Sequence, residues 1–400
     1  MEKKCALGVD IGTGSIKALV GMINGRDNIT IIGSGFVPTV GFSKGHLTDS
    51  AELAKAVKEA IDCAVMASRA IVETVYLGIG GLDIVSVNGI GSIATKHENA
   101  ITGEDVARAA RAATVLLTPE NHRTLHSLPT GYWVDGKKSS EVPVGYCGTR
   151  LEVEAHIVSL PELVIGEIIA ALSAQGIQVA GVIANAVTVA EIYASTFADH
   201  PCMVIDIGAG LVDLVLYYQG KIWLSASIPL GGDYVTSDIM QSIGVSRTHA
   251  EEIKRYYAKL SNELRGQDIV LDCNSYGTTD KKVTYDFLAK VIESRVEEIV
   301  DMIHQYIQPV LSRHGLEKVI LTGGSALLPS FATHTEKILG VLVEVVGLKG
   351  MVPVEYDHPS NVACYGILRT VARRTLAERS ETDGRDNLWC SLVNRIKRFM

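Results

Sequence analysis

Residues 203–218 read Met-Val-Ile-Asp-Ile-Gly-Ala-Gly-Leu-Val-Asp-Leu-Val-Leu-Tyr-Tyr, which is a hydrophobic strand, a glycine-rich turn and a second strand. Residues 7–20, Leu-Gly-Val-Asp-Ile-Gly-Thr-Gly-Ser-Ile-Lys-Ala-Leu-Val, carry the same pattern. In each copy a turn dipeptide, Asn24-Gly25 or Gln219-Gly220, precedes a third strand-like stretch. The repeat predicts two related halves that each begin with a three-stranded antiparallel meander.

The composition is that of a compact globular protein with more than one domain. The chain has 400 residues, of which 47% are hydrophobic and 20% are charged, and this length exceeds what one core usually serves. The net charge of −8 argues against nucleic acid as a partner. Seven cysteines have neither metal-ligand nor redox spacing, which indicates a reducing, cytosolic compartment. Because no apolar stretch approaches the ~18 residues that cross a bilayer, we expect any membrane contact to be at the surface.

Between and after the two hairpins, the pattern of the sequence changes several times. Residues 83–160 mix strand-like runs with an Ala-rich helix and predict an inserted α+β subdomain. Residues 379–387 are polar and contain a glycine, which predicts a flexible linker. Helices are predicted at 50–70, 104–117, 161–174, 187–196, 235–243, 247–264 and 287–313. Strands outside the hairpins are predicted at 75–81, 179–183, 269–271, 282–285 and 318–321.

The tip of the first hairpin has the composition of a phosphate-binding turn. Gly12 and Gly14 permit positive φ and carry no Cβ, so backbone N–H groups can approach a phosphate closely. Thr13 and Ser15 can add hydroxyl hydrogen bonds, and Lys17 is either a further phosphate contact or a solvated residue of the hairpin. The Walker pattern GxxxxGK[ST] does not occur in the sequence, so the phosphate site is of another class.

An aspartate ends the first strand of each hairpin, Asp10 in one copy and Asp206 in the other. These carboxylates can hold the waters of a phosphate-bound Mg²⁺, an ion that keeps several waters and takes few protein carboxylates. One such hairpin could be a structural turn. Two copies, followed by the Gly323-Gly324 loop, favour ATP and Mg²⁺ as cofactors held between two halves.

Together these motifs resemble the superfamily of actin, sugar kinases and heat-shock chaperones, with phosphate hairpins at 10–17 and 206–213 and an adenosine loop at 321–329. Within it the chain is most similar to the FtsA family of bacterial cell-division proteins, and the resemblance covers nearly the whole chain. The hairpins are specific only to the superfamily, whereas the insert and the tail together are specific to FtsA. The stretches that carry the FtsA resemblance are 121–135, 143–145, 151–156, 228–239, 250–254 and 291–295.

The resemblance implies an α/β fold of the actin type, with two ribonuclease-H-like halves, an inserted α+β subdomain and a C-terminal amphipathic helix. The implied boundaries are 1–82 with 163–198 for the first half, 83–162 for the insert, 199–229 with 315–378 for the second half, 230–314 for its small subdomain, 379–387 for the linker and 388–400 for the amphipathic helix.

The resemblance also implies that Gly231, Gly232, Glu251 and Lys254 lie near the ribose and adenine. The alternative interpretation is a turn and an exposed ion pair at spacing i,i+3. The full set of residues that we expect at the nucleotide is Asp10, Gly12, Thr13, Gly14, Ser15, Lys17, Asp206, Gly208, Gly210, Gly231, Gly232, Glu251, Lys254, Gly323, Gly324 and Ser325, with Asp10 and Asp206 holding Mg²⁺ through water.

One departure from the superfamily pattern concerns hydrolysis. In hydrolysing relatives a Glu or Gln near the start of the helix after the third strand of this half orients the attacking water. Here residues 185–188, Asn-Ala-Val-Thr, occupy that place. Because water orientation is a large part of phosphoryl-transfer catalysis, we expect ATP to be hydrolysed slowly or not at all and assign no catalytic residue. Asp213 and Glu191 are the candidates that could stand in.

Residues 388–400 read Leu-Trp-Cys-Ser-Leu-Val-Asn-Arg-Ile-Lys-Arg-Phe-Met. At about 100° per residue the large apolar side chains fall within an arc of about 140°, and polar and basic residues fill the rest. Basic residues beside an apolar stripe favour a helix on an anionic membrane surface, and the alternative is a helix docked on the protein's own core. The residues expected in the membrane are Leu388, Trp389, Leu392, Val393, Ile396 and Phe399.

The FtsA resemblance implies an ATP-binding adaptor that polymerises at the cytoplasmic face of the inner membrane, at the division site, as a peripheral protein. It implies contact with the C-terminal tail of the tubulin-like protein FtsZ through residues 230–314. There Arg295 is either a contact for the acidic tail or only a partner of Glu298 on its own helix. The insert would serve filament contacts and later division proteins.

Two other functions remain open from the sequence. One is a small-molecule kinase of the same superfamily, which needs a catalytic Asp in a substrate cleft. The other is a pilus-assembly relative of FtsA, which the basic amphipathic tail disfavours. A heat-shock chaperone is disfavoured because no substrate-binding domain follows the ATPase-like part.

Overall fold

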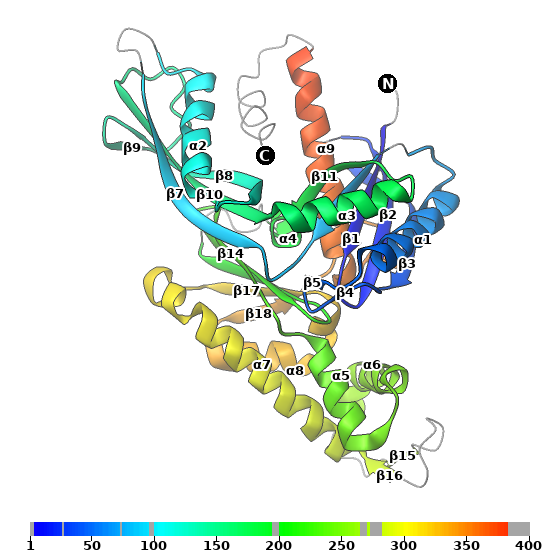
Figure 1. Cartoon of the computed structure of the whole chain (residues 1–400). Coiled ribbons are helices and arrows are strands. Elements are labelled where there is room, and N and C mark those ends of the chain that lie inside the picture. Colours follow the sequence, from blue (N-terminus) through cyan, green and yellow to red (C-terminus); the bar gives the residue numbers. More distant parts are fainter. Residues whose placement is uncertain are drawn as a thin grey trace.

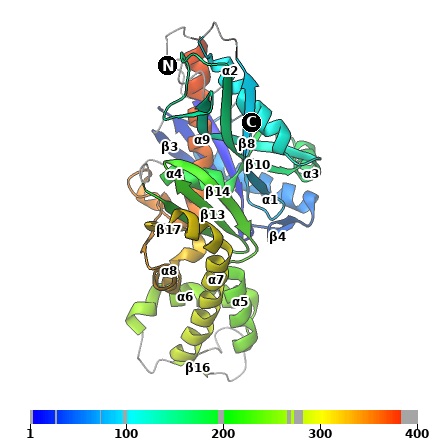
Figure 2. The same cartoon turned by 90° about the vertical axis from the view of Figure 1, so that its left-hand side faces the viewer.

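The computed structural model describes residues 4–25, 28–72, 74–95, 100–193, 200–264, 270–272 and 282–382. Two halves are each built on a five-stranded sheet, with an insert at one end of the molecule and a small helical subdomain at the other (Figure 1; Figure 2). This is the actin-like arrangement that the sequence predicted.

The first half contains a mixed sheet with the strand order β11-β6-β1-β2-β3. Strands β1, β2 and β3 form the predicted antiparallel meander, and β6 and β11 run parallel to β1. Its strands are β1 (Lys4–Ile11), β2 (Ser15–Ile23), β3 (Ile29–Pro38), β6 (Val75–Ile79) and β11 (Val179–Ala184). Helices α1 (Ser50–Ser68) and α3 (Glu162–Ala174) pack on one face of this sheet, where Leu53, Val57 and Ile168 are buried.

The second half repeats this topology with the order β14-β13-β12-β17-β18. A meander of three antiparallel strands is again followed by two strands parallel to the first. The matching strand orders confirm the prediction of two related halves. The strands are β12 (Cys202–Ile207), β13 (Val212–Tyr218), β14 (Lys221–Ile228), β17 (Lys318–Thr322) and β18 (Leu342–Val345).

Two helices form a central layer between the sheets. Helix α4 (Asn185–Tyr193) and helix α9 (Val362–Thr382) pack against each other, α9 covers β1 and β2, and α4 contacts β13 and β14. One hydrophobic core joins these helices to both sheets. Since α9 continues to Thr382, the prediction that the linker begins at residue 379 is wrong. Residues 376–382 contain no Gly or Pro, and several are good helix formers, so nothing ends the helix there. The rest of the predicted linker and all of 388–400 lie outside the described residues.

The inserted subdomain is a four-stranded antiparallel sheet with the order β7-β10-β8-β9 and one helix on its face. A capping box starts the helix, because Thr102 accepts from the N–H of Asp105 while the Asp105 carboxylate accepts from the N–H of Thr102. The elements of the insert are β7 (Val85–Ala94), α2 (Gly103–Leu117), β8 (His122–Val134), β9 (Lys137–Ser139) and β10 (Arg150–Pro161).

The small subdomain extends from the outer face of the second sheet, opposite the insert in Figure 2. Its elements are α5 (Gly232–Ile239), the π-helical turn η2 (Met240–Gly244), α6 (Arg247–Leu264), β15 (Val270–Asp272), β16 (Lys282–Thr284) and α7 (Tyr285–His314). The chain then returns to the second half through η4 (Gly324–Leu327), α8 (Pro329–Leu339), η5 (Val354–Tyr356) and η6 (Pro359–Asn361). Two short strands, β4 (Phe42–Ser43) and β5 (His46–Leu47), form a hairpin of the first half.

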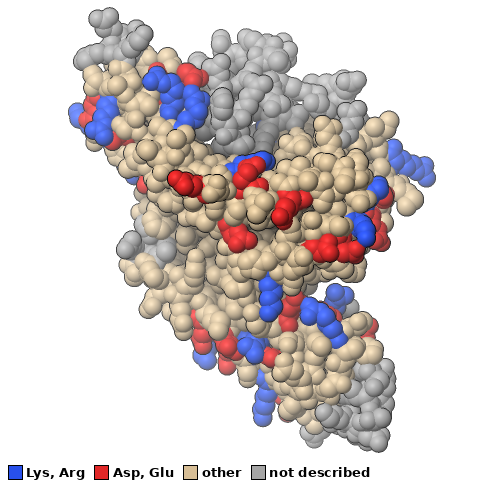
Figure 3. All heavy atoms as spheres, viewed as in Figure 1, with Lys and Arg blue, Asp and Glu red and all other residues tan. Residues whose placement is uncertain are grey.

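Charged side chains are mixed over the face shown in Figure 3. Acidic side chains lie across the middle of the molecule, and a group of basic side chains lies on the insert. Among the described helices, none is long and apolar enough to cross a membrane.

Candidate functional site

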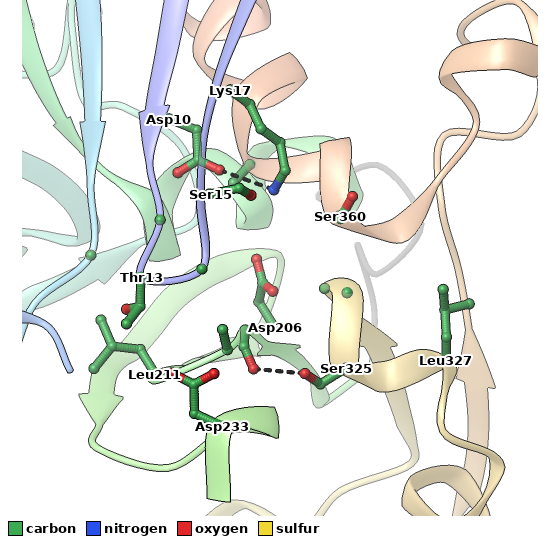
Figure 4. A pocket seen from close by; sticks show the side chains of 18 of the residues that line it. Asp10, Thr13, Ser15, Lys17, Asp206, Leu211, Asp233, Ser325, Leu327 and Ser360 are labelled. Atoms are coloured by element: carbon green, nitrogen blue, oxygen red, sulfur yellow. Dashed lines mark hydrogen bonds and ion pairs between the residues drawn. The ribbon is translucent and has the colours of Figure 1, made fainter. Parts of the chain in front are cut away.

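The tips of the two hairpins meet between the halves. A Cβ atom added at Gly14 would lie 2.8 Å from the Cβ of Ala209, and one added at Gly210 would lie 2.6 Å from Cγ2 of Thr13. Figure 4 shows Thr13 of the first tip opposite Leu211 of the second. The two tips therefore face each other at van der Waals distance, as the clamp predicted from the repeated motif requires.

A cavity of about 670 Å³ opens beside these tips, which is an ordinary size for a small-molecule site. The predicted residues that line it are Asp10, Gly12, Thr13, Gly14, Ser15, Lys17, Asp206, Gly208, Glu251, Lys254, Gly323, Gly324 and Ser325. Three predicted glycines, Gly210, Gly231 and Gly232, pack behind the lining. A Cβ at Gly231 would lie 2.4 Å from the Ala209 carbonyl oxygen, and one at Gly232 would lie 2.2 Å from Ser325 Oγ.

The prediction that Gly12 and Gly14 adopt positive φ is wrong, because neither lies in the left-handed region. What these positions require is space. A Cβ at Gly12 would lie 2.9 Å from the carbonyl oxygen of Ser15, and the Gly14 position is closed by Ala209. The glycines are therefore needed for the close approach of backbones rather than for an unusual turn conformation.

Gly323 differs from the hairpin glycines, because it has a φ of 88°. A Cβ there would lie 2.2 Å from Asp206 Oδ1 and 2.5 Å from the Ile207 carbonyl oxygen. Beside it, Ser325 Oγ donates to the carbonyl oxygen of Gly208 at 2.9 Å, a bond drawn in Figure 4. The predicted adenosine loop is thus fastened directly to the second hairpin.

Three carboxyl groups and one ammonium group converge at the tips. Burial, Asp213 and Asp10 raise the pKa of Asp206 to about 8, and burial raises the pKa of Asp213 to about 6. Burial also raises the pKa of Asp10, although Lys17 and Asn185 oppose this. Lys17 Nζ lies 3.6 Å from Asp10 Oδ2, and its side chain is only 13% exposed, so Lys17 is not the solvated residue that the alternative interpretation required.

This arrangement fits a divalent cation that arrives with phosphates. Three buried carboxyl groups face one lysine, so ionising them without a further cation is unfavourable. Among the described residues, no group of three or more His, Cys, Asp or Glu side chains could hold a metal ion by itself. Mg²⁺ commonly binds through one or two carboxylates together with water and substrate phosphates, and Asp10 and Asp206 are placed for that role.

Glu251 and Lys254 form a buried polar network with α5. Lys254 Nζ donates to Glu251 Oε1 at 2.7 Å, to Thr236 Oγ1 at 2.8 Å and to the Gly232 carbonyl oxygen at 3.1 Å. Although burial raises it, the pKa of Glu251 lies below its usual value because of Lys254. The alternative of an exposed ion pair is wrong. Lys254 has used its three donor hydrogens, whereas no printed bond involves Glu251 Oε2.

The cavity also contains residues that the sequence did not single out. They are Ile11, Phe36, Gly80, Ala209, Leu211, Asp233, Arg247, Arg255, Ala258, Leu327, Leu328, His358, Ser360 and Ala363. Some, such as Ala209 and Leu327, lie inside the recognised motifs and could have been included. His358 and Ser360 come from a segment with no local signal and reach the cavity only through tertiary packing.

The two candidates for orienting an attacking water are separated by the structure. Asp213 lines the cavity and accepts a hydrogen bond from Ser227. Glu191 is outside the lining and forms an ion pair with Arg373, so it is held in the central helical layer. Asn185 lines the cavity at the place where hydrolysing relatives carry their carboxylate or amide.

Arg295 lies on α7, away from the cavity lining. Its Nε and Nη2 donate to Asp238 of α5 at 2.5 and 3.1 Å, and its Nη1 donates to Glu298 at 2.6 Å. The pairing with Glu298 is therefore present, and the stronger bidentate contact is with α5. The guanidinium also lies over the ring of Tyr234.

The comparisons with known families match two parts of the chain. The family model "Cell division protein FtsA" matches residues 203–366, and the model "SHS2 domain inserted in FTSA" matches residues 81–159. The cell division protein FtsA of Escherichia coli K12 is 29% identical over 363 residues, which are 87% of this chain and 86% of the relative. The FtsA of Pseudomonas aeruginosa is 28% identical over 415 residues, covering 99% and 97%.

Solved structures support the fold. The chain matches a structure of a PilM–PilN type IV pilus biogenesis complex with a TM-score of 0.67 and 18% identity, covering 93% of this chain and 99% of the other. MreB5 of Spiroplasma citri, bound to AMPPNP, matches with a TM-score of 0.52 and 13% identity, covering 96% and 100%. Both family models and the relatives that match over most of the length agree with this actin-like fold. The chain belongs to the FtsA family of actin-like cell division proteins.

Proposed function

We propose that the cavity between the halves binds ATP together with Mg²⁺. The observation that carries this proposal is the meeting of both Asp-Ile-Gly hairpins and the Gly323 loop around one cavity. MreB5, which shares the fold, has been solved with AMPPNP and with ADP, and this supports a nucleotide as the ligand here.

The residues of the site divide into three groups by their chemistry. The hairpin tips offer backbone N–H groups and Lys17 to the phosphates, and Thr13 Oγ1 is a buried hydroxyl without a hydrogen-bond partner in the described structure. Glu251 Oε2 is the acceptor for ribose hydroxyls, since Lys254 and Thr236 use Oε1. The loop at Gly323 and Gly324 supplies the wall for the base. Bound Mg²⁺ would neutralise phosphate charge, while Asp10 and Asp206 hold its waters.

ATP is expected to be retained rather than turned over quickly. Asn185 cannot take a proton from water, and Asp213 is the remaining cavity carboxylate without an assigned role. The nucleotide then sets the conformation of the two halves, and that conformation governs assembly.

Equilibrium binding of ATP to the purified chain tests this proposal. Binding should depend on Mg²⁺, and Asp206→Asn should weaken it in Mg²⁺ but much less in EDTA. A chain that binds no ATP in either condition contradicts the proposal. Phosphate release near one turnover per second or faster would contradict slow hydrolysis.

We further propose that the chain is a peripheral adaptor at the cytoplasmic face of the inner membrane, at the division site. It would form filaments there, tether FtsZ through the FtsZ C-terminal tail and recruit later division proteins through the insert. Family membership supports the role in division, and the basic amphipathic sequence of 388–400 supports membrane binding. Filament formation would strengthen the binding, because many tails would engage the membrane at once.

The amphipathic segment can be tested by itself. Replacing Trp389→Ala and Phe399→Ala together removes two large apolar side chains, each worth roughly 1.5–3 kcal/mol at most when buried. Co-sedimentation with anionic liposomes should fall strongly, whereas the paired replacement Ser391→Ala and Asn394→Ala on the polar face should have little effect. Unchanged sedimentation of the Trp389 and Phe399 variant contradicts the membrane role.

A further inference from the structure

Asn185 connects the central helical layer to the first phosphate hairpin. It is the first residue of α4, directly after β11, and is 6% exposed. Its Nδ2 donates to Oδ1 of Asp10 at 2.8 Å. This bond joins two cavity residues that are far apart in the sequence.

The bond to Asn185 limits the directions in which the Asp10 carboxylate can point. Oδ1 accepts from Asn185, and Oδ2 faces Lys17 at 3.6 Å. The two groups approach different oxygens from different elements, α4 and β2. The carboxylate is therefore held in one plane before any ligand binds.

The neighbouring strand leaves space for this contact. A Cβ at Gly78 would lie 2.4 Å from Asn185 Oδ1, and one at Gly80 would lie 3.6 Å from Asn185 Nδ2 and 3.1 Å from Asp213 Oδ2. The end of β6 thus accommodates the amide beside the carboxylates. A bulkier side chain at Gly78 would displace the Asn185 amide.

The backbone around Asn185 is fixed as well. His126 Nε2, from β8 of the insert, accepts from the N–H of Ala184 at 3.1 Å, and Thr188 Oγ1 donates to the carbonyl oxygen of Asn185 at 2.8 Å. Both contacts are buried. The amide is consequently presented to Asp10 from a rigid position.

We propose that Asn185 is a positioning residue that orients Asp10 toward the waters of a nucleotide-bound divalent cation. This inference rests on the proposed binding of ATP with Mg²⁺. A neutral amide donates to Asp10 and stabilises its ionised form, whereas a carboxylate at this place would repel it. The position that orients water for hydrolysis in other members of the superfamily is thus used here to secure the cation.

The test compares the ATP dissociation constant in EDTA with that at saturating Mg²⁺, for the wild type and for Asn185→Leu. Leucine has a similar volume but no donor. Hydrogen-bond partners of metal-binding residues typically contribute 10–100-fold to metal affinity. The ratio of the two constants should therefore fall by about 10-fold or more, while the constant in EDTA changes little.

Thr188→Val is the matched control, because it removes a buried hydrogen bond from the same helical turn without touching Asp10. It should keep the wild-type ratio. Asn185→Ala, which creates space instead of filling it, provides the same comparison if the leucine variant does not fold.

An unchanged ratio in the Asn185 variants overturns the inference, as does an equal loss in EDTA and in Mg²⁺ or an equal loss in Thr188→Val. A wild-type chain that binds no ATP in either condition refutes instead the function on which the inference rests.

Discussion

The ammonium group of Lys44 lies over the ring of Tyr234, with 5.3 Å between Nζ and the ring centroid. Lys44 is at the tip of the β4–β5 hairpin of the first half, and Tyr234 belongs to α5 of the small subdomain. The adjacent Gly45 packs closely on Leu211, which lines the cavity. On its other contact, Tyr234 meets the guanidinium of Arg295 at 5.9 Å. One tyrosine thus connects the two halves to the surface that carries Arg295.

Replacement of Tyr234 should speed the release of nucleotide. Each cation–π contact at an exposed site is worth about 0.5–1 kcal/mol, so Tyr234→Leu should accelerate ATP release about 2- to 5-fold in a stopped-flow chase. Tyr306→Leu, at an exposed tyrosine of α7, is the control and should release ATP at the wild-type rate. Equal rates for all three proteins would show that the Lys44–Tyr234 contact does not restrain the halves.

Asp206→Asn should stabilise the nucleotide-free protein at alkaline pH. The pKa of Asp206 is raised to about 8 in the folded protein, so stability is highest where the carboxyl is protonated in both states. It declines as pH rises from the unfolded pKa of about 4 through the folded pKa of about 8. The variant lacks this decline, and its advantage at about pH 8.5 should be on the order of 1–3 kcal/mol.

Chemical unfolding in EDTA between about pH 5.5 and about pH 8.5 measures this advantage. The gap between variant and wild type should widen with pH in that window. A gap that is constant with pH would contradict the raised pKa of Asp206. The added stability should accompany weaker Mg²⁺-dependent ATP binding, because the carboxylate that destabilises the empty site is the one proposed to serve the cation.

Gly323→Ala should abolish ATP binding and destabilise the fold. The new Cβ would meet Asp206 Oδ1 and the backbone of Ile207, so the adenosine loop must move away from the hairpin. Gly350→Ala is a matched control, since Gly350 has a φ of 77° but no atom within 4 Å of the added Cβ. Both variants bear the backbone strain of roughly 1–2 kcal/mol, and only Gly323→Ala should lose nucleotide affinity, by at least about 10-fold. Equal ATP affinities in the two variants would be the contradicting result.

His156→Gln should reduce the sensitivity of the protein to acid. His156 of the insert is buried, and burial lowers its pKa to about 4. Nδ1 pairs with Asn88 Oδ1 at 2.7 Å, and Nε2 pairs with Ser225 Oγ of β14 at 2.8 Å. A depressed histidine pKa gives stability that is present above the unfolded pKa of about 6.5 and is lost as pH falls toward about 4.

This loss should amount to on the order of 2 kcal/mol at about pH 5 in the wild type and should be smaller in the variant. Unfolding curves at about pH 7.5 and about pH 5 provide the comparison. His46→Gln, at an exposed histidine of the β4–β5 hairpin, should retain the wild-type loss. If His156→Gln also retains it, the contact between the insert and β14 is not the acid-sensitive element.

The sequence predicted those parts of the molecule whose signal is local. The two hairpins and α6 follow from adjacent residues, and α6 has the predicted bounds of Arg247–Leu264. Helix α9 was not predicted. Residues 362–368 at its start are all buried between the two halves, so the helix lacks the one-sided apolar pattern that marks a surface helix.

The candidate site was predictable to the same extent. Asp10, Asp206 and Gly323 belong to motifs with a recognisable order, and all three line the cavity. The bond from Asn185 to Asp10 was not foreseen, because it depends on how β11 and α4 sit beside β1. The hairpin glycines were identified correctly, but for the wrong reason: the approach of the second hairpin, which no local pattern reveals, determines why Gly14 cannot carry a side chain.

The central claim is that ATP binding and the C-terminal segment together bring FtsZ to a membrane. Its most direct test is co-sedimentation of FtsZ with anionic liposomes in the presence of the purified chain. FtsZ should sediment with the wild type in Mg²⁺ and ATP. It should stay in solution without nucleotide, and also with the Trp389→Ala and Phe399→Ala variant. Recruitment that is equal with and without ATP, or that survives the loss of both aromatic side chains, would contradict the account.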